Sequence, residues 1–280
     1  MSRTMTASLA CLCVVGCASR SNPSFPLTMA EAKATLRQMR EDPRPLERPV
    51  VVVAGLLDPG FDVQRIAGSL RRVSTGDDMV TSVTFMSLTT DSFDGCRDYL
   101  IERVEQAFGT TRTRDTIEVD VIGFSMGGLV ARHASRPRSD GGKRLAIRRL
   151  FTISTPHCGA RLAELPTLDQ RTIDMRADSD FLAALNEALA DADYELFCYT
   201  RLGDWIVGVE NAAPPGQTAW WVPSPPMSFA HLGAATDARI LADIARRLRG
   251  EAPLTTEPPT PASELSAKPV IDSSPQASGT

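Results

Sequence analysis

The chain has 280 residues, of which 42% are hydrophobic and 23% are charged, with 19 Gly and 20 Pro. This balance is typical of a globular protein, and it excludes a wholly disordered chain, a collagen and a protein with many membrane spans. The formal net charge of −4 gives no overall attraction to nucleic acid or to an anionic membrane, so no nucleic-acid partner is expected.

The first residues have the pattern of an export signal. Arg3 is followed by an apolar run from Met5 to Val15, which is shorter than the ~20 residues that cross a bilayer. The segment VVGC, ending at Cys17, resembles a bacterial lipobox, in which the cysteine is lipidated and becomes the new N-terminus. We expect residues 1–16 to be a lipoprotein signal peptide and Cys17 to carry a membrane anchor, which makes the protein an exported bacterial lipoprotein of the cell envelope. The alternative is an ordinary signal peptide, or an apolar start that is never cleaved.

The middle of the chain alternates short runs rich in Val and Ile with longer amphipathic stretches. That alternation is typical of a parallel sheet with helices on both faces. Strands are predicted at Pro49–Ala54, Met79–Met86, Thr116–Ile122, Leu150–Ser154 and Tyr194–Thr200. Helices are predicted at Leu27–Met39, Cys96–Phe108, Asp180–Ala190 and Thr236–Leu248. Since each gap between strands has room for a crossover helix, a single α/β domain with a doubly wound sheet is expected.

This domain is expected to span residues 27–250, after a tether at residues 17–26. Residues 251–280 are predicted to be a disordered tail. Six of these thirty residues are proline and most of the others are Ser, Thr, Ala and Glu, so the segment buries too little apolar surface to offset the entropy of ordering.

The strongest functional motif lies between Glu118 and His133. The five residues from Gly123 to Gly127 match the pattern G-x-S-x-G, with a predicted strand before them and a helix after them. In this context Ser125 stands on a sharp turn at a helix N-terminus, where the helix dipole favours developing negative charge. Glycine is needed on both sides because a side chain there would collide with neighbouring backbone. The motif predicts that Ser125 is a nucleophile.

Around this motif the sequence resembles the α/β-hydrolase superfamily, and within it bacterial lipase-like and esterase-like proteins. The block VIGFSMGGLVAR carries most of the resemblance, and the segments Leu150–Ala160 and Asp174–Asn186 are similar to segments of those lipases. The resemblance covers roughly Pro49–Arg249. It implies the α/β-hydrolase fold, a Ser-His-Asp triad in the chain order Ser, Asp, His, and no metal or organic cofactor.

Three histidines are candidates for the base. His133 lies eight residues after Ser125 on the same predicted helix, roughly 12 Å along its axis and too far to take the serine proton. His157 precedes every suitable late acid. His231 stands on a loop just before the last predicted helix, where the histidine of the superfamily falls, and it is the predicted base.

The acid is expected on the loop after the fifth predicted strand. Asp204 lies there, and the four residues that begin with it, DWIV, resemble the D-x-(V/I)-V segment of the superfamily. As the predicted acid, Asp204 would hold His231 in the required tautomer and stabilise its protonated form. Glu210 is the reserve candidate.

An oxyanion hole needs two backbone N–H groups. One is predicted from Met126, the residue after the nucleophile, and the other from Leu56 on the loop after the first predicted strand, with Leu57 as the alternative. Gly55 and Leu56 align with the H-G-x sequence of lipases, but Ala54 replaces the usual histidine.

These residues predict a serine hydrolase that cleaves carboxylic esters through an acyl enzyme, with a small-molecule or lipid ester as its substrate. The segment Ala160–Asp178 is a candidate cap. Apolar residues that could form an acyl site, or equally belong to the core, are Leu56, Leu57, Phe124, Met126, Trp205, Trp220 and Trp221. The alternative function is a catalytically inactive, membrane-tethered binding protein with the hydrolase fold, for which the altered Ala54 is the support.

Three cysteines would remain beside Cys17 after export: Cys96, Cys158 and Cys198. Their number allows one disulfide at most, and buried free thiols are favoured over that disulfide. No Cys or His spacing suggests a metal site.

Overall fold

The computed structural model describes residues 21–86, 90–225 and 227–263. The predicted signal peptide, the predicted lipidation site Cys17 and residues 264–280 of the predicted tail lie outside the described residues. No helix within these described ranges is long and apolar enough to cross a membrane.

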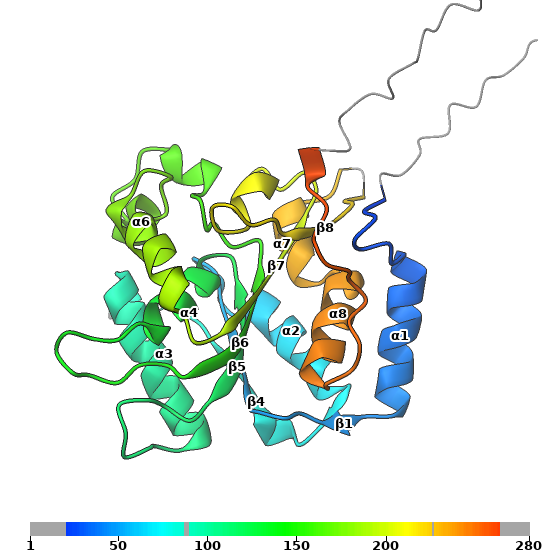
Figure 1. Ribbon diagram of the computed structural model, residues 1–280, viewed down its shortest axis with the longest axis horizontal. Coiled ribbons are helices and arrows are strands. Elements are labelled where there is room, and N and C mark those ends of the chain that lie inside the picture. The colour runs from blue at the N-terminus through cyan, green and yellow to red at the C-terminus, as the bar shows by residue number, and fades with distance from the viewer. Residues whose placement is uncertain (1–20, 87–89, 226, 264–280) are drawn as a thin grey trace, which may run out of the picture.

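A parallel sheet of six strands forms the centre of the molecule (Figure 1). The strand order is β4-β2-β5-β6-β7-β8, and every neighbouring pair is parallel. Strand β4 therefore lies on one side of β2, and the later strands β5 to β8 follow one another on the other side. The strands are β2 (Val50–Val53), β4 (Val80–Val83), β5 (Val119–Phe124), β6 (Ile147–Ile153), β7 (Glu195–Arg201) and β8 (Trp220–Val222). A separate parallel pair consists of β1 (Arg44–Pro45) and β3 (Ser74–Thr75).

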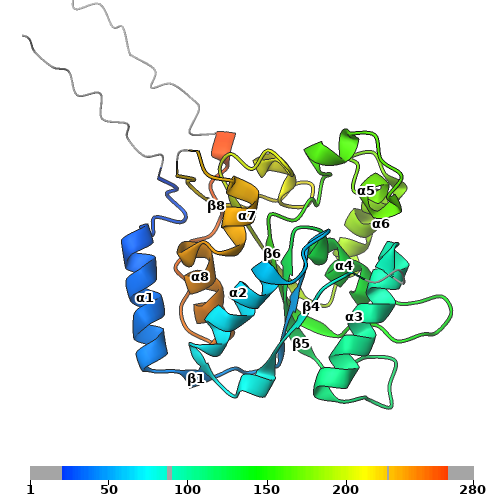
Figure 2. The same cartoon turned by 180° about the vertical axis from the view of Figure 1, so that it is seen from behind.

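Helices cover both faces of the sheet, as Figure 2 shows with α1, α2 and α8 on one side and α3 and α4 on the other. The side chains of β2 alternate between the two layers. Val50 and Val52 pack in the core that includes α1, α2, α7 and α8, whereas Val51 and Val53 pack in the core that includes α3, α4 and α6. All four are fully buried, as expected for a strand covered on both faces. The predicted doubly wound α/β sheet is thus confirmed.

The helices are α1 (Met29–Glu41), α2 (Phe61–Arg71), α3 (Phe93–Phe108), α4 (Met126–Ser135), α5 (Gln170–Asp174), α6 (Asp180–Glu187), α7 (Ala230–Ala235) and α8 (Ala238–Leu248).

All five predicted strands and all four predicted helices are present, with shifted ends. The elements that the sequence did not predict are α2, α5, α7, β8 and the short strands β1 and β3. Helix α2 begins after Gly60, which is in a left-handed conformation and makes no side-chain cap, so the sequence gives no start signal for it. Strand β8 has only three residues, too few for a hydrophobic pattern. The three cysteines Cys96, Cys158 and Cys198 are free.

The N-terminal tether was predicted too long, because part of it packs onto the domain. Asn22, Ser24 and Phe25 are each no more than 3% exposed. The Asn22 side-chain amide donates to the carbonyl of Trp221, and the Phe25 ring packs edge-on against Tyr199. These contacts make residues 22–25 part of the folded unit.

The prediction of a disordered tail is wrong for residues 251–263. The indole N–H of Trp220 donates to the Thr256 carbonyl over 3.0 Å, and that of Trp221 donates to the Thr260 carbonyl over 2.8 Å. Proline reduces the conformational freedom of the unfolded chain, so ordering this segment costs less than its composition suggests. Figure 1 shows the start (blue) and the end (red) of the described chain close together.

Deleting residues 251–280 is expected to lower the melting temperature by roughly 2–12 °C, whereas deleting only residues 264–280 is expected to leave it unchanged. The longer deletion removes the N–H and the hydroxyl of Thr255, which both donate to the fully buried carboxylate of Asp243. Asp243 keeps Tyr199 and Arg247 as partners, but the loss of hydrogen bonds to a buried charged group still costs about 1–3 kcal/mol. Each kcal/mol corresponds to about 2–4 °C in a domain of this size. Thermal unfolding followed by circular dichroism compares the two chains, and equal melting temperatures would contradict this contribution.

Candidate active site

The candidate site lies where the direction of strand addition reverses, between β2 and β5. In open α/β sheets, ligands bind outside the carboxyl ends of the strands at such a switch point. The loop from Ala54 to Leu56 leaves β2 there, and Ser125 follows β5 directly. Gly55 lies against the nucleophile turn, because a Cβ on Gly55 would be only 3.1 Å from the Cβ of Ser125. The topology thus brings two segments about 70 residues apart in the chain into contact.

Ser125 stands on a strained turn that close packing enforces. Its φ of 52° and ψ of −125° lie in a region that costs a non-glycine residue about 1–3 kcal/mol. A Cβ on Gly123 would be 2.4 Å from the Gly128 Cα, and a Cβ on Gly127 would be 2.3 Å from the Val53 carbonyl oxygen. Both glycines of the motif are therefore required because neighbouring backbone occupies the space of a side chain.

The structure brings Ser125, His231 and Asp204 into one hydrogen-bonded line. The distance from His231 Nε2 to Ser125 Oγ is 3.0 Å, and that from His231 Nδ1 to Asp204 Oδ2 is 2.8 Å. With the imidazole proton on Nδ1, the serine hydroxyl donates to Nε2 and the Nδ1–H donates to Asp204. These distances are within the hydrogen-bond reach that a nucleophile, a base and an orienting acid require.

Asp204 is held ionised by its neighbours. Burial would raise the pKa of this carboxyl, but the hydrogen bond and charge of His231, with hydrogen bonds from the Val207 N–H and the Ser154 side chain, lower the pKa below its usual value. Its Oδ1 also accepts the N–H of Ile206 at 3.1 Å. A carboxylate with a depressed pKa favours the folded state above about pH 4, and this stabilisation is lost as the pH falls through the folded-state pKa. Asp204 is therefore charged at neutral pH.

His231 lies within helix α7 and not on a loop, which corrects the predicted local structure. Gly233 of α7 packs directly against Arg201 at the end of β7, since a Cβ on Gly233 would overlap the Arg201 guanidinium. Arg201 is 3.4 Å from the buried Asp237, which caps the N-terminus of α8. The strand that precedes Asp204 is thereby packed against the helix that carries His231.

The other two histidines have different surroundings. His133 Nε2 is 2.8 Å from Asp94 on α3, away from the serine. His157 is fully buried, with Nδ1 2.9 Å from Arg132 and Nε2 3.1 Å from the Thr152 hydroxyl. Burial and the nearby Arg132 charge lower the pKa of His157 well below its usual value, so it is a neutral acceptor for a buried arginine.

Glu210, the reserve acid, pairs with Arg161 at the surface. It belongs to the short helix η5 (Val209–Asn211), and no hydrogen bond among the described residues joins it to His231. Asp204 alone of the two candidates contacts the imidazole.

The two predicted oxyanion-hole donors lie on either side of Ser125. Met126 is the first residue of α4, where a backbone N–H has no partner within the helix. Leu56 belongs to the loop that packs on Ser125 through Gly55. Within the described chain, neither of these two backbone N–H groups donates a hydrogen bond to a protein acceptor. The Met126 side chain is fully buried in the core, so only its N–H is available to a ligand.

A cavity of about 500 Å³ opens beside Ser125 and His231. Most of its wall is apolar. The predicted acyl-site residues Leu56, Leu57 and Phe124 line it, together with five residues of the predicted cap: Ala160, Leu162, Ala163, Thr172 and Met175. Trp220 and Trp221 do not contribute, because both are buried in β8.

Two acidic residues of the cavity wall, Asp58 and Asp62, were not predicted from the sequence. Burial and the neighbouring Asp58 raise the pKa of Asp62, while the charges of Arg65 and His231 oppose the rise. Asp58 is 8% exposed, and its Oδ1 accepts the Gly60 N–H while Oδ2 has no partner among the described residues. The segment DPGFD reads as an ordinary turn, and only the fold places both carboxyls in the cavity.

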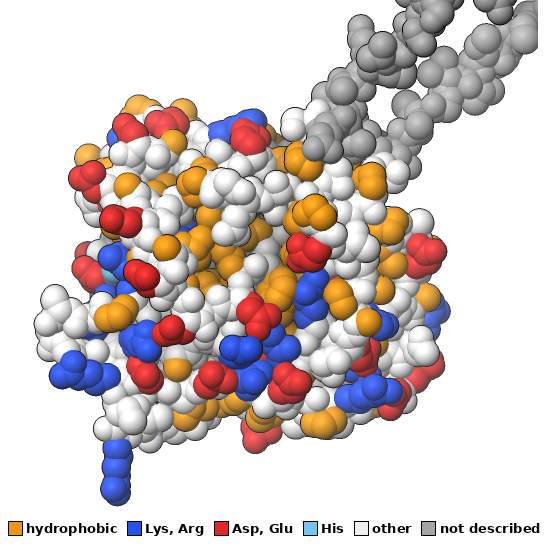
Figure 3. All heavy atoms as spheres, viewed as in Figure 1, with side chains coloured by type: hydrophobic (Ala, Val, Ile, Leu, Met, Phe, Trp, Pro, Cys, Tyr) orange, Lys and Arg blue, Asp and Glu red, His pale blue; other side chains and the backbone are white. Residues whose placement is uncertain are grey.

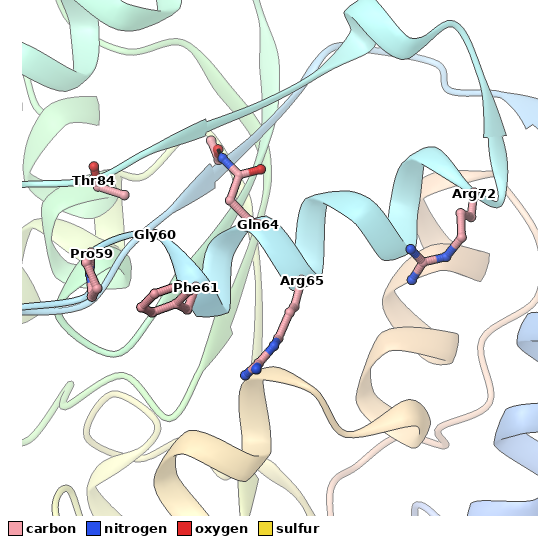
Figure 4. Close-up of a pocket in the computed structure, with 8 residues that line it drawn as sticks. Pro59, Gly60, Phe61, Gln64, Arg65, Arg72 and Thr84 are labelled. Atoms are coloured by element: carbon pink, nitrogen blue, oxygen red, sulfur yellow. Dashed lines mark hydrogen bonds between the residues drawn. The ribbon is translucent and has the colours of Figure 1, made fainter.

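A second, more polar hollow of about 630 Å³ lies on the outer side of α2 and β4. Figure 4 shows Arg65 extending from α2 and Arg72 from the residue just after its C-terminal end, with Pro59 and Phe61 at the start of the helix. Phe61 lines both hollows. Ser125 and His231 line only the first, which is therefore the candidate substrate site.

Comparison with known proteins supports this fold. Residues 47–175 match the family described as PGAP1-like alpha/beta domain, a range that contains Ser125 but neither Asp204 nor His231. No curated protein shows a significant match to the chain.

Two solved structures are similar in fold. The phospholipase PlaB from Legionella pneumophila, solved in complex with thio-NAD, has a TM-score of 0.53 at 14% identity, over 72% of this chain and 58% of that chain. The product of gene lin2722 from Listeria innocua has a TM-score of 0.51 at 13% identity, over 73% of this chain and 95% of that one. The chain thus spans little more than half the length of the phospholipase chain. The parallel sheet, the two helix layers and these neighbours together show that the protein has the α/β-hydrolase fold.

Proposed function

We propose that the protein is a serine hydrolase that cleaves carboxylic esters. The observation that carries the proposal is the hydrogen-bonded line from Ser125 through His231 to Asp204 at the mouth of an apolar cavity. A serine is weakly nucleophilic unless an adjacent base takes its proton, and this line supplies such a base with an acid that orients it.

In the first half of the reaction, Ser125 Oγ attacks the ester carbonyl carbon while its proton passes to His231 Nε2. The carbonyl oxygen becomes an oxyanion, which the backbone N–H groups of Met126 and Leu56 stabilise. The intermediate collapses, the carbon–oxygen bond to the alcohol breaks, and His231 returns the proton to the departing alcohol. The products are an alcohol and an acyl enzyme on Ser125.

In the second half, His231 takes a proton from water as the water oxygen attacks the acyl carbon. Collapse of the second intermediate releases the carboxylic acid, and the proton returns to Ser125 Oγ. Asp204 stays ionised throughout and stabilises the imidazolium of His231. The strained backbone at Ser125 holds the hydroxyl above the sheet edge in both halves.

The apolar cavity wall favours esters with an aliphatic acyl group. The similar structure from L. pneumophila is a phospholipase, so phospholipids are candidate substrates beside neutral lipids and small esters. We further propose that the protein is exported and anchored in the cell envelope through a lipid on Cys17, as the sequence pattern of residues 1–17 indicates.

Purified protein is expected to react with a fluorophosphonate probe and to hydrolyse p-nitrophenyl esters with a graded dependence on acyl length. Each methylene that enters the cavity contributes about 0.8 kcal/mol, which corresponds to about a fourfold rise in kcat/KM, until the cavity is full. A series from acetate to decanoate measures this while the leaving group stays constant. A wild-type protein that neither reacts with the probe nor turns over any of these esters would favour the inactive binding protein.

A further inference from the structure

The exposed large apolar side chains of this protein all lie at one end of the sheet. Ten such residues are exposed among the described residues, and each belongs to a segment that follows the carboxyl end of a strand. Four of them also line the cavity beside Ser125. The other six, here called the apolar rim, are Met86, Leu165, Leu168, Trp205, Met227 and Phe229.

The apolar rim is not explained by the cavity. Leu168 and Met227 are as exposed as in an unfolded chain, and Phe229 is 70% exposed. Single exposed apolar residues are normal in proteins, but a group of them around a site marks an interaction surface. The rim residues come from the segments after β4, β6, β7 and β8, so they surround the cavity mouth from several sides.

Two of the exposed apolar residues have a strained backbone. Among the described residues, four that are not glycine have a positive φ: Leu57, Ser125, Ser154 and Met227. Ser125 and Ser154 belong to the candidate active site, while Leu57 and Met227 are 70% and 104% exposed. Strain of this kind persists only where the surrounding structure enforces it, and it gathers at functional sites.

The start of the described chain lies at this same end. Asn22 bonds to the Trp221 carbonyl, one residue before the end of β8, and the segment after β8 carries Met227 and Phe229. Figures 1 and 2 both show the chain start at the end of the molecule where α7 lies, with α5 at that end in Figure 2. Cys17 precedes Ser21 by four residues, which span at most roughly 14 Å of extended chain. A lipid on Cys17 would therefore keep the apolar rim close to the bilayer.

The surface chemistry favours apolar insertion over electrostatic attraction. Figure 3 shows apolar side chains in the upper half of the view, where the rim end lies, with Asp and Glu side chains among them, and most Lys and Arg side chains in the lower half. A net charge of −4 gives no attraction to anionic lipid.

We propose that the apolar rim rests on the lipid bilayer, so that the cavity opens directly onto the membrane and takes ester substrate from it. This inference rests on the proposed hydrolase function, because the rim surrounds the cavity that holds Ser125. Leu168, Met227 and Phe229 enter the acyl region, and Trp205 lies at its border, a position that suits the amphipathic indole ring.

Trp205 provides the test, since it is exposed while Trp220 and Trp221 are buried. The full chain is reconstituted into phosphatidylcholine vesicles with or without bromine on the acyl chains, and tryptophan emission is compared. Brominated lipid is expected to quench the emission, and most of this quenching is expected to disappear in Trp205→Phe. Quenching that is absent, or that Trp205→Phe leaves unchanged, would overturn the proposal and would mean that water or a protein covers the rim.

A pair of double variants separates docking from catalysis. Leu168→Asp/Met227→Asp is expected to reduce the quenching of Trp205 and to lower turnover of a long-chain ester carried in vesicles, with turnover of soluble p-nitrophenyl butyrate unchanged. The matched control Thr110→Asp/Ser139→Asp adds the same charge at exposed positions that precede β5 and β6, and it is expected to behave as wild type. If both double variants gave the wild-type result with vesicles, the docking surface would be wrong.

The same vesicles distinguish this proposal from the proposed function. Ser125→Ala is expected to be quenched as strongly as wild type, because docking does not need the nucleophile. A protein that is quenched but never hydrolyses an ester would remove the hydrolase function and leave the docking surface. A protein that hydrolyses soluble esters, but whose tryptophan emission is not quenched, would keep the hydrolase function and remove the docking surface.

Discussion

Replacing Ser125 with alanine is expected to reduce ester turnover by about 10⁶-fold, the size of loss seen when a serine hydrolase loses its nucleophile. The hydroxyl is the atom that attacks the carbonyl, and its 3.0 Å distance to His231 Nε2 makes it the hydroxyl that a base can activate. Labelling by a fluorophosphonate probe should be lost together with turnover. The measurements are p-nitrophenyl butyrate hydrolysis and probe labelling on the same preparation.

The control for this variant is Ser228→Ala, which changes an exposed serine three residues before His231. Among the described residues, the Ser228 hydroxyl donates only to the Pro225 carbonyl, and Ser228 does not line the cavity, so labelling and turnover should match wild type. Thermal unfolding of Ser125→Ala shows whether the fold is kept, and retained folding assigns the loss to the hydroxyl. A folded Ser125→Ala protein that is still labelled would place the nucleophile elsewhere.

The second large effect concerns the two buried histidines, whose replacement should affect turnover differently. His231→Ala is expected to lose turnover by about 10⁶-fold, because a base is removed from the nucleophile. It is also expected to cost about 1–3 kcal/mol of stability, because the buried Asp204 loses its imidazole partner. His157→Ala is expected to keep the chemistry of folded molecules but to lose about 1–3 kcal/mol of stability. Its Nδ1 is a hydrogen-bond partner of the buried Arg132, whose guanidinium would then keep only Asn186 and Leu185 as acceptors in the part of the chain that the structure describes.

Turnover and thermal unfolding, measured on both variants, give four values that distinguish the two roles. His157→Gln serves as a milder variant if His157→Ala does not fold, because its amide oxygen can still accept a hydrogen bond from Arg132. A loss of turnover in folded His157→Gln, with normal turnover in His231→Ala, would reverse the assignment of the base.

The part of the site that the residues alone predicted is local in the chain, whereas Asp204 and His231 were predicted through the resemblance to the α/β-hydrolase superfamily. Gly123, Ser125 and Gly127 lie within five residues, and their spacing is dictated by the turn itself, since neighbouring backbone occupies the space of any side chain at either glycine. Apolar strands such as β2 are equally local signals, because burial on both faces requires an unbroken run of valines. Such features need no knowledge of distant residues.

The elements that the sequence did not predict depend on contacts made at a distance. Residues 251–263 have the composition of a disordered segment, and they become ordered because Trp220, Trp221 and Asp243 are buried with polar atoms that need partners. Residues 22–25 fold for the same reason, beside Trp221 and Tyr199. The composition of a segment indicates how much apolar surface the segment can bury by itself. It does not show which hydrogen-bond partners another segment of the chain will supply.

By itself, the sequence predicted the class of fold and the position of the nucleophile, because hydrophobic period and turn geometry are properties of neighbouring residues. The resemblance to the α/β-hydrolase superfamily implied the chain order of the nucleophile's partners. Only the tertiary structure decided that His231 and not His157 reaches Ser125, that Asp58 and Asp62 enter the cavity, and that the exposed apolar side chains share one end of the molecule. The reason is physical. Parallel strands place their carboxyl ends together, so segments that follow β2, β5, β7 and β8 meet at one edge although they are far apart in the chain.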